Sequence, residues 1–492
     1  MWIKKRGLIG GCFIVLAAAL TACAPTTARM ERTPHAPRRA KYVILMIGDG
    51  MGARHVDAAA KFGGAPLGMT SLEHHGYMTT FMRNPTAKSG PYASEYWDDG
   101  SRMGSYDPER GGHTPWQSPS DPAYPQYNAT DSAASASAIL SGRKTVRYAL
   151  NVEATEPGYA HDGVNSIRYH RTIVDAAESL DMATGVVTSV NFNHATPAAA
   201  VVKTPYRKNY GEKARQLLES PLEVIMGAGH PRYDSNGKQR AATYKSWSRN
   251  AGPYLNDTDG RALFSKAVAN EYGRRFIDSR TDFDDLADGD GRFRGHDLPK
   301  QVFGLARVAD TLQFNRSRSK DPTAGAAAKL DNVPSLATMT RGALAVLSRC
   351  QNGFWLLVEG GAIDWAGHAN DMQRMLEELS GFDAAVQAVI QWVNDGTNDA
   401  GWDNTLVIVT ADHETGYLQP VGHYSGAAVI EHQCWGVDCN GWNEHTNSLV
   451  PIYAQGVGAA SLKATFDGDY RDNTDIFKTM LKALGRKPQV DR

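Results

Sequence analysis

The sequence lacks a surplus of either charge, and this removes one class of partner. Its 492 residues include 52 lysines and arginines against 53 aspartates and glutamates, a formal net charge of −1. Binding to a polyanion through the overall field of a protein needs a basic surplus. We therefore expect no nucleic acid recognition. A chain of this length can bury a large core, either as one α/β domain with insertions or as two domains.

The apolar run near the N-terminus is too short for a comfortable membrane span. It covers residues 8–20 and follows the basic residues 4–6. A charged start followed by a short apolar stretch is typical of a signal peptide. We therefore expect residues 1–22 to be a signal peptide and the mature chain to be exported.

The end of this run, Leu20-Thr21-Ala22-Cys23, resembles the lipobox of bacterial lipoproteins. The resemblance implies cleavage before Cys23 and attachment of lipid to its thiol, which would hold the protein on the periplasmic side of a bacterial membrane. A plain secretory signal, cut after Ala22 or Ala24, is the alternative. Residues 23–40 are rich in Pro, Thr and Arg, and we expect a flexible tether with a mean span of roughly 20–25 Å.

Cysteine is scarce, with five in the chain, and two of these, Cys12 and Cys23, belong to the signal. Cys434 and Cys439 lie five residues apart in a loop, and an oxidising compartment would let them form a disulfide. A metal site at this pair is the weaker alternative because no second pair exists. Cys350 ends a predicted helix and is expected to be a small buried side chain.

Two ligand-binding motifs are incomplete. The glycines of residues 48–52 do not follow the GxGxxG order of a nucleotide-binding loop. The aspartates of residues 282–290 do not have the spacing of an EF-hand calcium loop. We therefore predict neither site.

Uninterrupted apolar runs alternate with amphipathic stretches along most of the chain. Such runs are typical of strands buried on both faces of a parallel sheet. The fold class predicted is α/β, a three-layer sandwich with a mostly parallel central sheet, helices on both faces and loop-rich insertions. The domain should cover residues 41–485, with insertions at about 83–127 and 230–332. The predicted strands are residues 42–47, 76–81, 184–190, 224–226, 354–358, 405–410 and 450–454.

Residues 131–142 are predicted to form a helix that presents a serine at its start. Asp131 is a good N-cap and Gly142 a good C-terminal stop. Ser132 then lies in the first turn, where free N–H groups and the helix dipole favour an anion. Its hydroxyl is well placed to hold a phosphate, although an ordinary N-terminal serine would fit the same pattern.

Polar residues follow five of the predicted elements at what should be one edge of the sheet. Asp364 and His368 are four residues apart, so one helical turn places them on one face, and His445 could add a third zinc ligand. The alternative for His445 is a satisfied loop histidine.

A second zinc could be held by Asp49, Asp412 and His413, with the Ser132 hydroxyl in its open position. Glu359 and Thr196 offer oxygen ligands for magnesium, with Asp49 bridging the two sites. The alternatives are a surface turn at residues 412–413 and a helix-capping partner at Glu359.

The motifs together resemble the alkaline phosphatase family over about residues 42–485. They are Ile47-Gly-Asp49-Gly-Met-Gly52, Thr130-Asp-Ser132-Ala-Ala-Ser135, Glu359-Gly-Gly-Ala-Ile-Asp364 with His368, Thr410-Ala-Asp412-His413 and His445-Thr446. The resemblance implies a phosphomonoesterase with two zinc ions and one magnesium ion. In such an enzyme Ser132 is phosphorylated, and hydrolysis of the phosphoserine then frees the serine. By motif position, Arg207 would clamp two phosphate oxygens; its alternative is a surface side chain.

Two positions depart from the pattern of some family members. His194 stands where some members carry an aspartate near the magnesium, so its place would be in the second shell of that ion. Trp365 stands where some carry a lysine, which removes a charge near the phosphate.

Two other functions stay open at this point. A superfamily relative could act on diesters, sulfates or phosphonates, although the Cys/Ser-x-Pro-x-Arg context of a sulfatase is absent around Ser132. A non-catalytic surface lipoprotein would be expected to lack metal ligands, and none is missing. The expected partners are small phosphate monoesters and the membrane, with a homodimer left open.

Overall fold

The computed structural model describes residues 39–63, 65–83, 105–127, 129–153, 168–240, 262–288, 291–317, 328–419, 434–436 and 441–487. All of these belong to one compact unit, Arg38–Arg492. The predicted signal peptide, nearly all of the predicted tether, Cys23 and Cys439 lie outside the described residues. Within these ranges, no helix is both long enough and apolar enough to cross a membrane.

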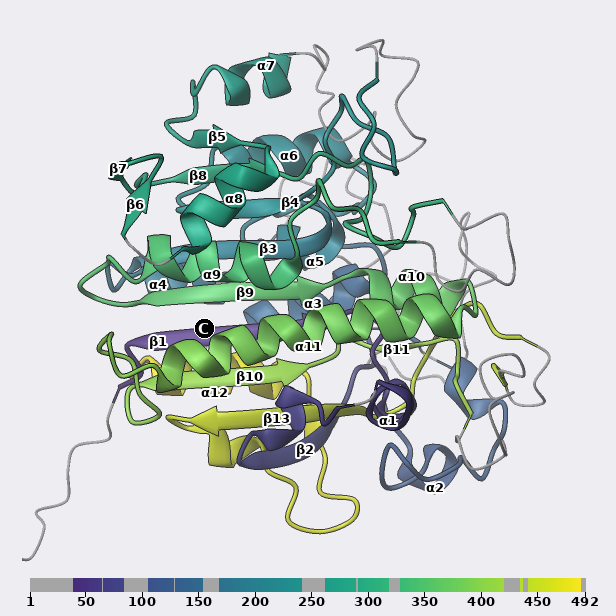
Figure 1. Ribbon diagram of the computed structural model, residues 1–492. Helices are drawn as coiled ribbons and strands as arrows, with labels where there is room; N and C mark the ends of the chain where they lie inside the picture. The colour runs from purple at the N-terminus through teal and green to yellow at the C-terminus, as the bar shows by residue number, and fades with distance from the viewer. Residues whose placement is uncertain are drawn as a thin grey trace, which may run out of the picture. The chain divides into compact units, whose positions relative to one another are not determined.

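A ten-stranded sheet forms the centre of the domain, in the order β14-β2-β13-β10-β1-β9-β3-β4-β8-β5 (Figure 1). The seven strands from β10 to β5 are mutually parallel, and β13 joins them as an antiparallel neighbour of β10. The strands are β1 (Tyr42–Gly48), β2 (His74–Thr79), β3 (Ala183–Asn191), β4 (Val224–Ala228), β5 (Arg275–Ile277), β8 (Val302–Leu305), β9 (Phe354–Gly360), β10 (Thr405–Thr410), β13 (Val450–Gly456) and β14 (Arg471–Asp472).

The central strands are buried along their whole length, as their apolar runs predicted. Helices cover both faces because crossovers between parallel strands place them there. One face carries α1 (Ala53–Phe62), α8 (Arg280–Ala287), α9 (Leu336–Leu347) and the long α11 (Met372–Asn394), which crosses β1 and β9 (Figure 1). The other carries α3 (Ser132–Ser141), α4 (Ile173–Glu178), α5 (Ala195–Ala198) and α12 (Thr474–Ala483). The predicted α/β sandwich is confirmed.

The remaining elements are short or lie outside the main layers. They are α2 (Pro108–Gly111), α6 (Tyr210–Leu218), α7 (Ala262–Val268), α10 (Ala362–His368), the pair β6 (Arg292–Phe293) and β7 (His296–Asp297), and the pair β11 (Glu414–Thr415) and β12 (His445–Thr446).

Part of the range predicted as an insertion builds the sheet. Residues 230–332 supply β5 and β8, which extend the parallel sheet beyond β4. These strands have three and four residues, so their apolar runs are too short to be distinguished from the polar sequence around them.

Candidate metal centre and nucleophile

The carboxyl ends of three adjacent strands bring acidic side chains together. Ile47 of β1 pairs with Thr410 of β10 on one side and with Glu359 of β9 on the other. Asp49 follows β1 directly and Asp412 lies two residues after the end of β10, and each is fully buried, as is Glu359. Because parallel strands end at one edge of a sheet, their three carboxylates meet there.

The first group of ligands joins Asp364 with His368 and His445. The Nε2 atoms of both histidines lie 3.3 Å from Asp364 Oδ1 and 3.1 Å from each other. Asp364 and His368 lie one turn apart on α10, as predicted, and His445 comes from β12. The second ring nitrogens of the histidines face backbone oxygens, with His445 Nδ1 2.8 Å from the Thr130 carbonyl. These two contacts orient the Nε2 atoms of both histidines toward Asp364.

The second group joins Asp49, Asp412 and His413. His413 Nε2 lies 3.4 Å from Asp49 Oδ1 and 3.3 Å from Asp412 Oδ2. The backbone N–H of Gly50 donates to Asp412 Oδ1 at 3.1 Å. Gly50 has a φ of 74°, and a Cβ there would lie 2.7 Å from the Asp364 Cα. A residue with a side chain would therefore push the two groups apart.

The third group joins Asp49, Glu359 and His194, so Asp49 is shared between the second and third groups. The Thr196 hydroxyl donates to Asp49 Oδ2 at 3.3 Å. Thr196 and Glu359 therefore both lie beside Asp49, and their role as magnesium ligands stays a prediction. His194 was expected in a second shell, and the structure places it among the side chains that could contact an ion directly.

Ser132 is the first residue of α3 and lies beside the second group. Its Oγ is 3.3 Å from His413 Nε2. Asp131 caps the helix by accepting from the Ala134 N–H at 3.1 Å, and Gly142 ends it with a φ of 69°. The local prediction of a capped helix with the serine in its first turn is confirmed.

Arg207 lines the same cavity as Ser132. Its Nη1 donates to Asp131 Oδ2 at 2.8 Å, and its Nη2 lies 3.4 Å from His194 Nε2. Burial would lower the pKa of Arg207, but Asp131 holds it above its ordinary value. The guanidinium is therefore a fixed positive charge in the cavity that Ser132 also lines.

The buried carboxylates are not neutralised by the described side chains. One oxygen of each of Asp49, Asp412 and Glu359 has no hydrogen-bond partner among the described residues, and neither does His194 Nδ1. Burial and neighbouring carboxylates raise the pKa values of Asp49 and Asp412, and burial raises that of Glu359 to about 7. Buried anions of this kind are costly unless a cation balances them.

The protonation states of the buried histidines suit metal binding. Burial lowers the pKa of His413 and of His194, which keeps both imidazoles neutral. Burial would raise the pKa of Asp364, but His368 and His445 hold it well below its usual range. Neutral imidazoles and carboxylates fit zinc, and a set richer in oxygen fits magnesium. The residues present therefore fit metal ions at all three groups.

The cavity above these groups has a volume of about 620 Å³. Trp365 and Phe314 form part of its wall, with ring centroids 6.3 Å apart, and the Trp365 ring is 6.1 Å from that of His194. Trp365 therefore presents an aromatic surface to a substrate at the position where the sequence predicted a missing charge.

Two threonines in the site were not predicted. The Thr415 hydroxyl donates to Asp364 Oδ1 at 2.6 Å and lies 3.2 Å from His413 Nδ1, so it links the first two groups. The Thr188 hydroxyl donates to Glu359 Oε2. Thr188 is paired with Glu359 across β3 and β9, and only this register could have indicated its role.

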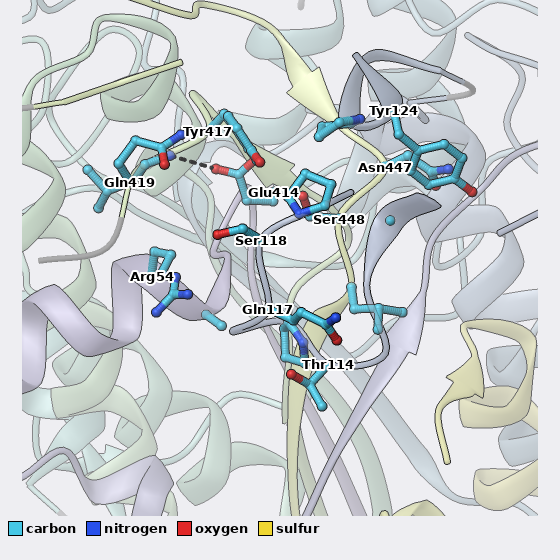
Figure 2. Close-up of a pocket in the computed structure, with 17 residues that line it drawn as sticks. Arg54, Thr114, Gln117, Ser118, Tyr124, Glu414, Tyr417, Gln419, Asn447 and Ser448 are labelled. Atoms are coloured by element: carbon cyan, nitrogen blue, oxygen red, sulfur yellow. Dashed lines mark hydrogen bonds between the residues drawn. The ribbon is translucent and has the colours of Figure 1, made fainter. Parts of the chain in front are cut away.

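Glu414 follows the ligand His413 but faces a different space. It lines a cavity of about 40 Å³ together with Tyr124, Asn447 and Ser448 (Figure 2). Its carboxylate accepts from the Thr446 hydroxyl at 2.5 Å and from the Leu418 N–H at 3.4 Å. Glu414 therefore holds β11 against β12 and is not part of the ligand groups.

Of the predicted cysteine sites, Cys434 is disulfide-bonded. Because Cys439 lies outside the described residues, the pairing of these two stays a prediction. Cys350 is a free thiol that is half-buried, and its Sγ donates to the Asp181 carbonyl at 3.3 Å.

Comparison with known proteins gives a consistent family likeness. A family model described as alkaline phosphatase matches residues 117–436. The alkaline phosphatase of Escherichia coli K12 is 29% identical over 91% of this chain and 87% of its own length. The structure of alkaline phosphatase from the Antarctic bacterium TAB5 superposes with a TM-score of 0.58 at 21% identity, over 92% of this chain and all of that one. The Thermus thermophilus alkaline phosphatase gives 0.59 at 20% identity, over 95% and 97%.

Proposed function

Because this chain belongs to the alkaline phosphatase family and is a phosphoric monoester hydrolase, we propose that Ser132 is the nucleophile of the reaction. The first step forms a bond between Ser132 Oγ and phosphorus while the ester P–O bond breaks and the alcohol leaves. In the second step water forms a P–O bond as the bond to Ser132 Oγ breaks, which releases inorganic phosphate. The serine is free again after each turnover.

The observation that carries the proposal is the position of Ser132 beside one candidate metal ligand and in the same cavity as an arginine. Its Oγ lies beside the ligand His413, and the guanidinium of Arg207 lines the same cavity. A guanidinium suits two phosphate oxygens at once. The first turn of the ten-residue helix α3 adds N–H groups that favour the same anion.

We assign one zinc to Asp364, His368 and His445, and a second to Asp49, Asp412 and His413. Magnesium is assigned to Glu359, Thr196 and Asp49, with His194 beside it. When bound, such cations lower the pKa of the serine hydroxyl and of water and neutralise the phosphate oxygens. The unpartnered oxygens of Asp49, Asp412 and Glu359 support this assignment.

Export of the chain and its anchoring through lipid on Cys23 belong to the same proposal. The support is the basic start, the short apolar run and the Leu20-Thr21-Ala22-Cys23 sequence. Mass spectrometry of the mature N-terminus tests it, because a lipid-bearing Cys23 is expected there and an unmodified N-terminal Cys23 or Pro25 would contradict the lipid anchor.

Hydrolysis of a simple aryl phosphate at alkaline pH tests the function. Turnover should require metal, stop on addition of a chelator and return when zinc and magnesium are restored. The same preparation assayed with an aryl phosphate diester and an aryl sulfate measures the specificity. Faster hydrolysis of either would overturn the assignment to monoesters.

A further inference from the structure

A second large cavity lies on the face that carries α4 and the end of α12. It has a volume of about 810 Å³ and is lined by residues near the ends of these helices and of α3. Five exposed cations line it: Arg143, Arg168, Arg171, Arg486 and Lys487. We call this set the basic face.

Among the described residues, two acidic side chains line this cavity beside the five cations. They are Glu153 and Asp175, and each has a cation outside the cavity as a neighbour. Glu153 lies 3.7 Å from Arg83, and Asp175 lies 3.9 Å from Lys203. Among the residues that the structure describes, cations therefore outnumber acidic side chains at the basic face, on a chain whose overall charge is nearly zero.

The chain enters the domain beside the basic face. The backbone N–H of Ala40 donates to the Ala483 carbonyl at 2.8 Å, and the Arg39 side chain lies against Gly485, next to Arg486. Residues 23–40, the predicted tether, thus begin their path to the N-terminus at this place.

The direction of β1 separates this entrance from the metal centre. The strand starts at Tyr42, close to the basic face, and Asp49 follows its other end. At about 3.3 Å per residue, its seven residues span roughly 20 Å. A surface in contact with the basic face would therefore not cover the Ser132 cavity, which lies at the opposite edge of the sheet.

From these positions we propose that the basic face docks on the anionic phospholipid headgroups of the membrane to which the N-terminus is predicted to be attached. A tether of this length keeps the domain close to the surface, so a weak contact is populated. Each lysine or arginine near an anionic membrane surface adds to the attraction between the protein and the membrane. Tyr169, 58% exposed, also lines the cavity and has the amphipathic ring common at membrane interfaces.

Charge excludes two other occupants of the cavity. The predicted tether carries Arg29, Arg32, Arg38 and Arg39 against Glu31, so it has the same sign as the basic face. A second copy of the chain that presented the same face would meet it with like charge. An anionic lipid surface has the opposite sign and lies within reach of the tether.

The test compares three forms of the full chain on vesicles of phosphatidylcholine, with and without phosphatidylglycerol. One form is the wild type. The second carries Arg168→Glu and Lys487→Glu, and the third carries Lys238→Glu and Lys266→Glu, which make the same change of charge on exposed lysines elsewhere. The N-terminus contributes equally to binding in all three, so the preference for phosphatidylglycerol reports the basic face.

We expect the Arg168/Lys487 variant to lose about tenfold or more of this preference and the lysine control to keep it. Equal preference in all three forms would overturn the proposal. Two other results would also overturn it. Self-association without vesicles that rises with concentration, and that only the Arg168/Lys487 variant loses, would indicate that a second copy of the chain binds the basic face. Displacement from vesicles by millimolar inorganic phosphate would indicate that the basic face binds a soluble anion.

Two further readouts keep the result unambiguous. Aryl phosphate hydrolysis should be unchanged in the Arg168/Lys487 variant, which separates docking from the proposed catalysis. In the wild type, hydrogen exchange of residues 168–172 and 484–487 should slow on vesicles that contain phosphatidylglycerol and not on phosphatidylcholine alone. Exchange that is the same on both would contradict the docking even if the variant failed to fold.

Discussion

Asp131 accepts a hydrogen bond from Arg207 at 2.8 Å while its other oxygen caps the helix that begins with Ser132. One carboxylate therefore fixes both the start of α3, which carries the proposed nucleophile, and the arginine that we propose binds phosphate. Burial would raise the pKa of Asp131, but Arg207 holds it below its ordinary value, so the pair is charged.

Asp131→Asn should separate these two roles. Asparagine is as good an N-cap as aspartate, so α3 should still begin at Ser132. The lost charge leaves Arg207 less firmly held, and we expect inorganic phosphate to inhibit about tenfold less well with kcat not reduced. Inhibition constants and kcat measured together check this. A fall in kcat with unchanged phosphate inhibition would contradict the positioning role.

Thr415→Val removes the hydroxyl that links Asp364 to His413. Groups that orient metal ligands typically contribute 10–100-fold to metal affinity, and a loss of about this size is expected. Competition with a chelator measures it. Thr410→Val is the matched control because that hydroxyl is also buried but donates to the Pro451 carbonyl. Equal losses in the two variants would indicate general destabilisation instead.

His194→Asp should change the preference of the third group of ligands. A carboxylate is a harder donor than an imidazole and adds negative charge beside Glu359 and Asp49. Magnesium is expected to bind several-fold more tightly, measured by activation of the metal-depleted enzyme in the presence of zinc and by metal content after dialysis. Unchanged magnesium dependence would show that residue 194 does not contact this site.

Glu378 gives a pH dependence that does not involve the metal centre. It is buried on α11, its Oε1 has no hydrogen-bond partner among the described residues, and burial raises its pKa to about 7. The folded state therefore favours the neutral acid. The stability that this form contributes is full below about pH 4.5 and is lost as the pH rises through 7.

The free energy of unfolding of Glu378→Gln minus that of the wild type should accordingly increase by on the order of 3 kcal/mol as the pH rises from 4.5 to 8. Denaturant unfolding at several pH values measures the difference. Glu377→Gln serves as the opposite control, since Glu377 pairs with Arg316 at 2.7 Å and Arg374 at 3.0 Å and its loss should destabilise. A difference for Glu378→Gln that does not depend on pH would contradict the raised pKa.

The sequence predicted those parts of the fold that depend on local pattern. The runs that became β1, β9 and β10 are continuous and apolar, and a strand buried on both faces has to look like this. The polar residues after them, Asp49 and Asp412, could then be placed at one edge without a structure. The strands β5 and β8 were not predicted because short segments join a sheet through pairing with a neighbour and not through their own pattern.

The same limit applies within the site. Candidate ligands such as His368 could be predicted from their spacing, because one helical turn fixes their relation to Asp364. Thr188 and Thr415 could not, since a threonine in a strand is common. The role of Thr188 comes from its register with Glu359, and that of Thr415 from the packing of β11 against α10. Nothing in the sequence context of His194 sets its distance from Asp49, so only the structure could group its ring with Asp49 and Glu359.

Phosphorylation of Ser132 tests the central claim most directly. The enzyme is mixed with an aryl phosphate, quenched in acid after a few turnovers and digested, and the peptide that contains residues 129–143 is examined by tandem mass spectrometry. We predict a phosphate on Ser132 that is absent without substrate and absent in Ser132→Ala, which should lose at least about a thousandfold in kcat. Continued turnover by Ser132→Ala, or phosphate on another residue of the wild type, would contradict the account.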